Sequence, residues 1–171
     1  MCNFYTVDRG RSYVVGQVIR LVRHIDVKPA ELQRHVDSLF PKGVSAHGER
    51  YLLRNGAGNV TDPASELHFE YVRRSVFPMR PSRFTSIFAT RSLEEAIEFR
   101  RRFGAPDDPV WEVEAEPGFV GNMNLVGGRN SILVQSWLAN EYWAGSAGPV
   151  STQFWEVLLS PPVRLVRRVT G

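Results

Sequence analysis

Glu156 is the residue whose surroundings in the sequence most strongly suggest chemistry. It stands near the start of a β-prone segment and is flanked by Phe154, Trp155 and Val157. A carboxylate among apolar neighbours is costly to bury unless it is paired or used, and it can stabilise positive charge that develops on a substrate. The alternative is an ordinary strand residue that faces outward. Glu141, near the end of a predicted helix and before a Gly/Ser-rich loop, is the competing carboxylate.

Metal and thiol chemistry are not expected from this sequence. Cys2 is the only cysteine, which excludes an intrachain disulfide and a thiolate metal cluster. The four histidines, His24, His35, His47 and His68, share no metal-ligand spacing and are interpreted as surface or hydrogen-bonded residues. The sequence also contains no phosphate-binding loop, dinucleotide-binding glycine fingerprint or G-x-S-x-G elbow.

The stretch 80–103 is the element around which the rest of the chain is organised. It is predicted to form a strand over 84–90 that turns directly into a helix. Ser92 and Glu95 have the spacing of a capping box, in which each side chain bonds a backbone N–H at the helix start. Polar side chains stand on both sides of this junction. The alternative is a βα unit with an ordinary helix cap.

The remaining sequence patterns alternate between strands and helices. Strands are predicted from β-branched and alternating residues over 3–7, 12–22, 110–116, 119–126, 152–159 and 163–169. Helices are predicted from apolar spacing and start signals over 29–40, 62–76 and 130–143. The Gly- and Asn-rich segment 41–61 is predicted to be a loop around 51–53. This order argues for an α+β fold with a mostly antiparallel sheet.

The composition is that of one ordinary globular domain. A chain of 171 residues can bury one sizeable core, so residues 1–171 are expected to form a single domain. No apolar run is long enough to cross a bilayer, and the polar N-terminus lacks the apolar core of a secretion signal, so we expect a cytoplasmic protein without a membrane partner. The net charge of +3, with nearly all cations arginine, permits a nucleotide or nucleic-acid partner without requiring one.

Three segments of the chain carry a family resemblance. The N-terminal segment FYTVDRGRSYVVGQVI contains the aromatic pair Phe4-Tyr5 and, after a short loop, a glycine turn. The central SIFATRSLEEAIEF is a strand that ends in aromatic, small and hydroxyl residues before a helix, and the C-terminal WEVLLSPPVRLVRRV opens a strand with Glu156. In this order they resemble the compact bacterial members of the ADP-ribosyltransferase-like superfamily, of the rifamycin ADP-ribosyltransferase and poly(ADP-ribose) polymerase-like type. That family has His at the position of Thr6 and often Tyr at that of Phe88.

The resemblance implies an α+β domain with split antiparallel sheets and flanking helices, which hold NAD+ in a cleft between the sheets. Glu156 would be the catalytic carboxylate, with Glu141 as the second candidate. Phe88 would pack on the nicotinamide ring, and Thr6 would replace the His that holds the adenosine-side ribose. The other implied NAD+ contacts, three of them arginines suited to the pyrophosphate, come from Tyr5, Arg9, Arg80, Arg83 and Ser86.

The implied activity is that of a mono-ADP-ribosyltransferase, which transfers ADP-ribose from NAD+ to a protein, a nucleic acid or a small molecule. Such a protein would serve as a toxin, a defence component or a modifying enzyme. The resemblance implies no metal, and it leaves the acceptor open. Two alternatives also stay open: an NAD+ glycohydrolase that uses water as the acceptor, and a non-catalytic binding module that keeps the fold.

Overall fold

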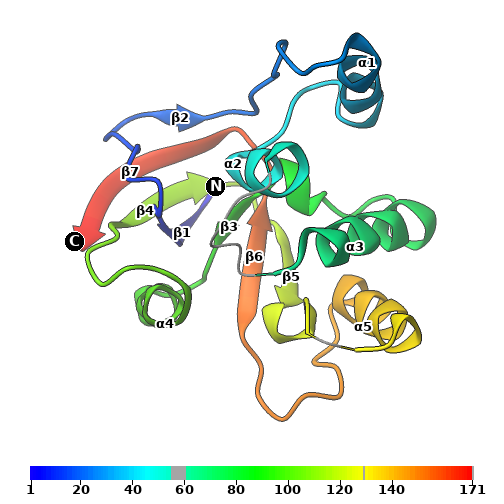
Figure 1. The fold of residues 1–171 in the computed structure, drawn as a ribbon. Coiled ribbons are helices and arrows are strands. Elements are labelled where there is room, and N and C mark those ends of the chain that lie inside the picture. Colours follow the sequence, from blue (N-terminus) through cyan, green and yellow to red (C-terminus); the bar gives the residue numbers. More distant parts are fainter. Residues whose placement is uncertain (55–60, 129, 171) are drawn as a thin grey trace.

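Two antiparallel sheets form the centre of the computed structural model, which describes residues 1–54, 61–128 and 130–170 (Figure 1). The first sheet has the order β1-β4-β7-β2, formed by Cys2–Val7, Val110–Ala115, Val163–Thr170 and Val18–Ile19. The second has the order β3-β6-β5, formed by Ile87–Ala89, Trp155–Leu159 and Phe119–Asn122. With its helices, the protein is an α+β domain, as the order of predicted elements indicates.

Five α-helices flank these sheets within the described residues: α1 (Ala30–Leu39), α2 (Ala46–Gly48), α3 (Pro63–Val76), α4 (Leu93–Phe103) and α5 (Ile132–Ala144). Helices α3 and α5 lie side by side next to the three-stranded sheet (Figure 1). Phe69, Tyr142, Trp143 and Leu158 lie in the core cluster between them and this sheet. In the part of the chain that the structure describes, no helix combines the length and apolar character needed to cross a membrane.

Two predicted helix starts are confirmed, because their capping residues act as expected. The side chain of Asp62 accepts a hydrogen bond from the backbone N–H of Ser65, and Pro63 occupies the first position of α3. At α4, Ser92 and Glu95 form both halves of the capping box. These two caps fix the first residues of α3 and α4.

The two sheets meet where β1 passes the end of β3. Tyr5 and Thr90 exchange backbone hydrogen bonds of 3.0 and 2.7 Å, and the Thr6 hydroxyl donates to the carbonyl of Phe88 at 2.7 Å. Strands β6 and β7 follow one another in the chain, yet β6 lies in the smaller sheet and β7 in the larger. The short link 160–162 therefore connects the two sheets at a second place.

Four strand predictions, 12–22, 84–90, 119–126 and 152–159, are too long. Residues 83–85 form a 3₁₀ turn, because the Ser82 side chain accepts the N–H of Phe84, and only Ile87–Ala89 is strand. Of 12–22, only Val18–Ile19 is strand, Val22 forms an isolated β-bridge with Val44, and Gly16 at φ 78° turns the chain before the strand. In both places local side-chain and turn geometry outweighs the β-branched composition.

Part of the predicted loop 41–61 is helical instead. Ser45 caps a short helix, and Glu49–Leu53 continues it as a π-helical turn. Tyr51 anchors this segment in a small core with Phe40, Val44 and Phe84. Residues 55–60 of the predicted loop lie outside the described residues. The predicted strand 119–126 ends at Asn122, whose side chain caps a 3₁₀ turn over Met123–Leu125.

Candidate functional site

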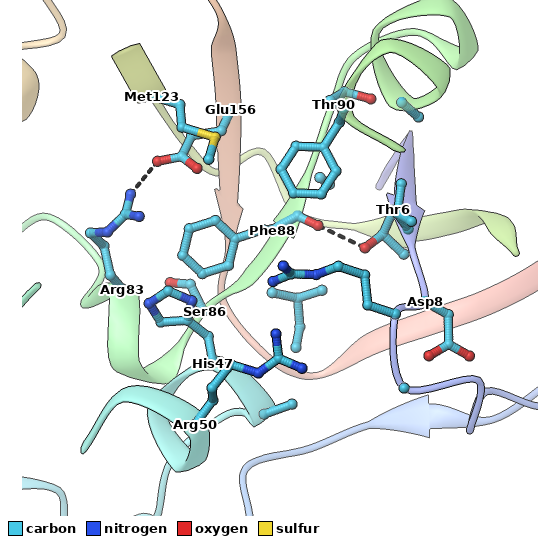
Figure 2. Close-up of a pocket in the computed structure, with 18 of the residues that line it drawn as sticks. Thr6, Asp8, His47, Arg50, Arg83, Ser86, Phe88, Thr90, Met123 and Glu156 are labelled. Carbon is cyan, nitrogen blue, oxygen red and sulfur yellow. Dashed lines mark hydrogen bonds and ion pairs between the residues drawn. The ribbon is translucent and has the colours of Figure 1, made fainter. Parts of the chain in front are cut away.

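A pocket with a cavity volume of about 190 Å³ opens where the two sheets meet (Figure 2). Its walls come from β1 and the loop after it, from α2 and the π-helical turn, and from β3, and the start of β6 adds Glu156. An enclosed volume of this size suits a ring with part of its sugar. A larger ligand would therefore extend from the cavity towards solvent.

Glu156 lies at the buried floor of this pocket, with 3% of its surface exposed. Its Oε1 accepts hydrogen bonds from Arg83 and from the hydroxyl of Tyr142, the latter at 2.7 Å. Its Oε2 is also shielded from solvent and has no hydrogen-bond partner among the described residues. Since a carboxylate oxygen accepts up to two hydrogen bonds, the hydrogen-bonding capacity of Oε2 is unused by the described residues.

Arg83 is held between two buried carboxylates. Its Nε and Nη2 donate to Glu66 at 2.8 and 3.0 Å, while Nη1 donates to Glu156 (Figure 2). Burial alone would lower the pKa of Arg83, but Glu156 and Glu66 raise it well above its ordinary value. Burial alone would raise the pKa of Glu66, but the charge of Arg83 holds it well below its usual range. Two carboxylates and one guanidinium give the floor an excess of one formal negative charge.

Tyr142 reaches this floor from α5 because Gly121 leaves room for its ring. Gly121 pairs with Glu156 across β5 and β6, and a Cβ atom at Gly121 would lie 2.5 Å from the Tyr142 ring. Burial raises the pKa of Tyr142 well above its ordinary value. The positive charge of Arg83 opposes this rise, and the negative charge of Glu156 adds to it. The phenol thus remains a donor to Glu156 while it accepts from Arg83 at 2.7 Å.

His47 forms part of the pocket wall between two aromatic rings. Its ring centroid lies 4.4 Å from those of Tyr51 and Phe88. Its Nε2 lies 3.3 Å from Oε2 of Glu66 but outside hydrogen-bonding geometry. Burial lowers the pKa of His47, although the Glu66 carboxylate opposes this effect. His47 is therefore a neutral pocket residue near neutral pH, and the expectation of a surface or hydrogen-bonded histidine is wrong here.

This pKa shift predicts acid sensitivity of the fold. Below the ordinary histidine pKa of 6.5, the unfolded chain binds a proton at His47 that the native state does not. Stability therefore falls as pH drops below 6.5 towards the lowered native pKa, by up to about 1.4 kcal/mol per pH unit. We expect His47→Phe, which keeps a stacking ring, to remove this slope. Urea unfolding between about pH 5 and 7 measures it.

His35 supplies the control for this experiment, because it is an exposed histidine on α1. His35→Phe should keep the wild-type slope. The Glu66 carboxylate does not obscure the measurement between about pH 5 and 7. The stability that Glu66 contributes is lost only at lower pH, as the pH falls from the ordinary pKa of 4.5 towards the lower pKa of the native state. An unchanged slope in His47→Phe would show that another group causes the acid sensitivity.

The hydroxyls near β1 and β3 are occupied by backbone groups. Thr6 donates to the carbonyl of Phe88, and Ser86 donates to that of Ser82 at 2.7 Å. The Thr90 hydroxyl donates to the carbonyl of Ser92 at 2.9 Å. These side chains hold the junction of the two sheets together, and towards a ligand they can act only as acceptors.

The structure brings together most, but not all, of the residues that the sequence singled out. One pocket is lined by Tyr5, Thr6, Arg9, Arg83, Ser86, Phe88 and Glu156. Arg80 is not among its lining residues, and its guanidinium lies over the ring of Phe119, 4.9 Å from the centroid. Glu141 on α5 is also absent from the lining, although its neighbour Tyr142 bonds Glu156.

The residues of the site that were not predicted include His47, Arg50, Glu66 and Tyr142. Glu66 lies in the first turn of α3, where an acidic residue is favoured by the helix dipole in any case. His47 and Arg50 fall in the segment that was predicted to be a loop. The only indication for Tyr142 in the sequence was its position next to the candidate Glu141, in the predicted helix that precedes Glu156.

Comparison with known families gives one match. The sequence model of a family described as "Protein of unknown function (DUF2441)" matches residues 4–170. No curated protein sequence matches the chain.

Proposed function

The chain thus belongs to the DUF2441 family, whose function is unknown, and we propose from its site that it is an NAD+-dependent mono-ADP-ribosyltransferase. The observation that carries the proposal is the geometry of Glu156. One of its oxygens is fixed by Arg83 and Tyr142, and the other is buried at the pocket floor without a described partner. A carboxylate oriented in this way is suited to a cationic group or a sugar hydroxyl.

In the proposed reaction, the bond between the ribose C1′ and the nicotinamide nitrogen breaks. Its electron pair leaves with nicotinamide, and positive charge develops on the ribose until a lone pair of the acceptor bonds to C1′ and the acceptor loses its proton. The Glu156 oxygen would accept a hydrogen bond from the ribose 2′-hydroxyl and stabilise this positive charge. The excess negative charge of the floor acts in the same direction, because it stabilises the positive charge that moves onto the ribose in the transition state.

The neighbouring residues support the same orientation of the substrate. Phe88 lines the pocket beside His47 and offers an aromatic surface for the nicotinamide ring. Arg83, assigned from the sequence to the pyrophosphate, already gives its Nε, Nη1 and Nη2 to Glu66, Glu156 and Tyr142. We therefore assign Arg83 to positioning Glu156. The fold fits the proposal as well, since the pocket lies between two small antiparallel sheets.

The direct test incubates the protein with NAD+ labelled in its adenylate phosphate, with and without a cell lysate. Label on a macromolecule or on a small-molecule acceptor supports transfer. Free ADP-ribose in the absence of an acceptor supports the glycohydrolase alternative. Intact NAD+ in both samples supports the non-catalytic binding module and contradicts the proposed enzyme.

Binding of NAD+ is expected to stabilise the native state. A ligand that binds only the folded protein adds about 2.7 kcal/mol at one hundred times its Kd. For a domain of this length, that corresponds to a rise in Tm of about 5–10 °C. Differential scanning fluorimetry with NAD+, ADP-ribose and nicotinamide measures the shift. An unchanged Tm with all three at millimolar concentration would argue against a nucleotide pocket.

A further inference from the structure

Two arginines that line the pocket, Arg9 and Arg50, have no hydrogen-bonding or ion-pair partner for their guanidinium groups among the described residues. Arg9 follows β1, and Arg50 belongs to the π-helical turn. Arginines nearby in the sequence differ from them. Arg11 pairs with Asp107 and Asp108, and Arg54 pairs with Glu49. Arg9 and Arg50 therefore differ both from these neighbours and from Arg83, the third arginine that lines the pocket, which is bonded to Glu66, Glu156 and Tyr142.

The two guanidinium groups are close enough to disfavour each other's charge. Burial is the main cause that lowers the pKa of Arg9, and the charge of Arg50 lowers it further. Arg9 also packs over Phe99, with its guanidinium carbon 5.8 Å from the ring centroid. Two like charges held together in a partly buried place are unfavourable unless an anion lies between or beside them.

The carboxylates of Asp8 and Asp108 make hydrogen bonds to other groups. Asp8 lines the pocket, but its Oδ2 accepts the backbone N–H of Tyr13. Asp108 opposes the lowering of the Arg9 pKa, but its two oxygens accept hydrogen bonds from Arg11 and from the backbone N–H of Ala105. Neither carboxylate hydrogen bonds to Arg9 or Arg50. The positive charge of the pair is thus left for a ligand.

We propose that Arg9 and Arg50 bind the diphosphate of a nucleotide whose base or sugar occupies the pocket floor. Guanidinium groups match phosphate oxygens in charge and in two-point geometry. In Figure 2, Arg50 and Glu156 lie on opposite sides of Phe88, so the cationic and anionic parts of the pocket are separated. A ligand with a cationic ring at one end and phosphates farther along fits this distribution of charge.

This inference rests on the proposed function for the identity of the group at the floor, but the anion site is tested separately. The probes are ADP-ribose, inorganic pyrophosphate and nicotinamide, and isothermal titration calorimetry measures their affinities. We expect Arg9→Gln and Arg50→Gln each to weaken ADP-ribose and pyrophosphate about tenfold or more, because each removes a charge-assisted contact. Nicotinamide, which has no phosphate, should bind each variant as it binds the wild type.

Arg54→Gln is the matched control, because Arg54 follows the same turn but is exposed and paired with Glu49. It should bind all three probes with wild-type affinity. Equal affinity of wild type, Arg9→Gln and Arg50→Gln for ADP-ribose would overturn the anion site. Binding of a short RNA that depends on Arg50, with no Arg50-dependent binding of ADP-ribose, would also overturn the anion site. The phosphate bound at Arg50 would then belong to an acceptor RNA and not to the nucleotide.

The failure of this inference can be distinguished from the failure of the proposed function. If ADP-ribose binding depends on Arg9 and Arg50 but NAD+ is never consumed, the anion site stands and the transferase proposal falls. If ADP-ribose is transferred to an acceptor with the same KM for NAD+ in wild type and both variants, the transferase proposal stands and the anion site falls. Increasing salt should weaken pyrophosphate binding to the wild type more than to either variant.

Discussion

Replacing Glu156 with Gln is expected to lower kcat for NAD+ consumption by about 10²–10³-fold, which corresponds to roughly 3–4 kcal/mol of transition-state stabilisation. The substitution keeps the volume and reach of the side chain and removes its charge. NAD+ affinity should change far less, because the charge acts mainly when the ribose becomes cationic. Single-turnover rates with labelled NAD+ give kcat, and titration calorimetry gives the affinity.

Glu141→Gln is the control for this prediction, because Glu141 is a carboxylate on α5 that does not line the pocket. Its activity should remain that of the wild type. The opposite pattern, with Glu141→Gln inactive and Glu156→Gln active, would refute the assignment of Glu156. If an active protein tolerates both substitutions, neither carboxylate is catalytic and the proposed mechanism is wrong.

Replacing Arg83 with Met is expected to cause the largest loss of stability, about 3–5 kcal/mol. The substitution leaves the carboxylates of Glu66 and Glu156, 1% and 3% exposed, without the guanidinium that lies between them. In urea unfolding, the loss of stability would appear as a lower midpoint concentration of urea at an unchanged m-value. Arg54→Met, which removes an exposed ion pair with Glu49, should change stability by no more than about 1 kcal/mol.

A double variant tests whether the loss comes from the unpaired charge. Arg83→Met combined with Glu66→Gln should be more stable than the sum of the two single effects, because the second change removes one of the carboxylates that the first leaves unpaired. Additive effects would show that Arg83 acts through packing on Phe88 and Tyr142 instead. Wild-type stability of Arg83→Met would refute the network as a structural element.

Local signals in the sequence predicted the helices well. Asp62-Pro63 and Ser92 with Glu95 mark their helix starts through contacts made within one turn, so no knowledge of the rest of the fold is needed. The limits of the strands were predicted less well. Whether 83–85 continues as a strand depends on a hydroxyl contact of Ser82, which the β-branched pattern does not report.

The partners of Glu156 could not be predicted from the sequence, for a physical reason. Its apolar neighbours indicated that the carboxylate is buried, and it is. Arg83 lies 73 residues away and Tyr142 lies 14 residues away, and their contacts exist only once β6 lies beside β3 and β5. From the sequence, Arg83 was interpreted as free to bind a phosphate. Its second carboxylate partner, Glu66, lies in the first turn of a helix, where acidic residues are common, so nothing in the sequence marked Glu66 as a partner of Arg83.

The way the floor is distributed along the chain has a consequence for folding. Glu66, Arg83, Tyr142 and Glu156 come from α3, a 3₁₀ turn, α5 and β6, and β6 follows the other three in the sequence. Contacts between such distant residues form slowly, because the entropy of closing long loops is lost before the contacts stabilise the chain. The charged groups must also stay hydrated until their partners arrive, since none is stable when buried alone. If the protein is the proposed transferase, its activity should therefore appear only with the completed fold, and no subset of the elements should be active.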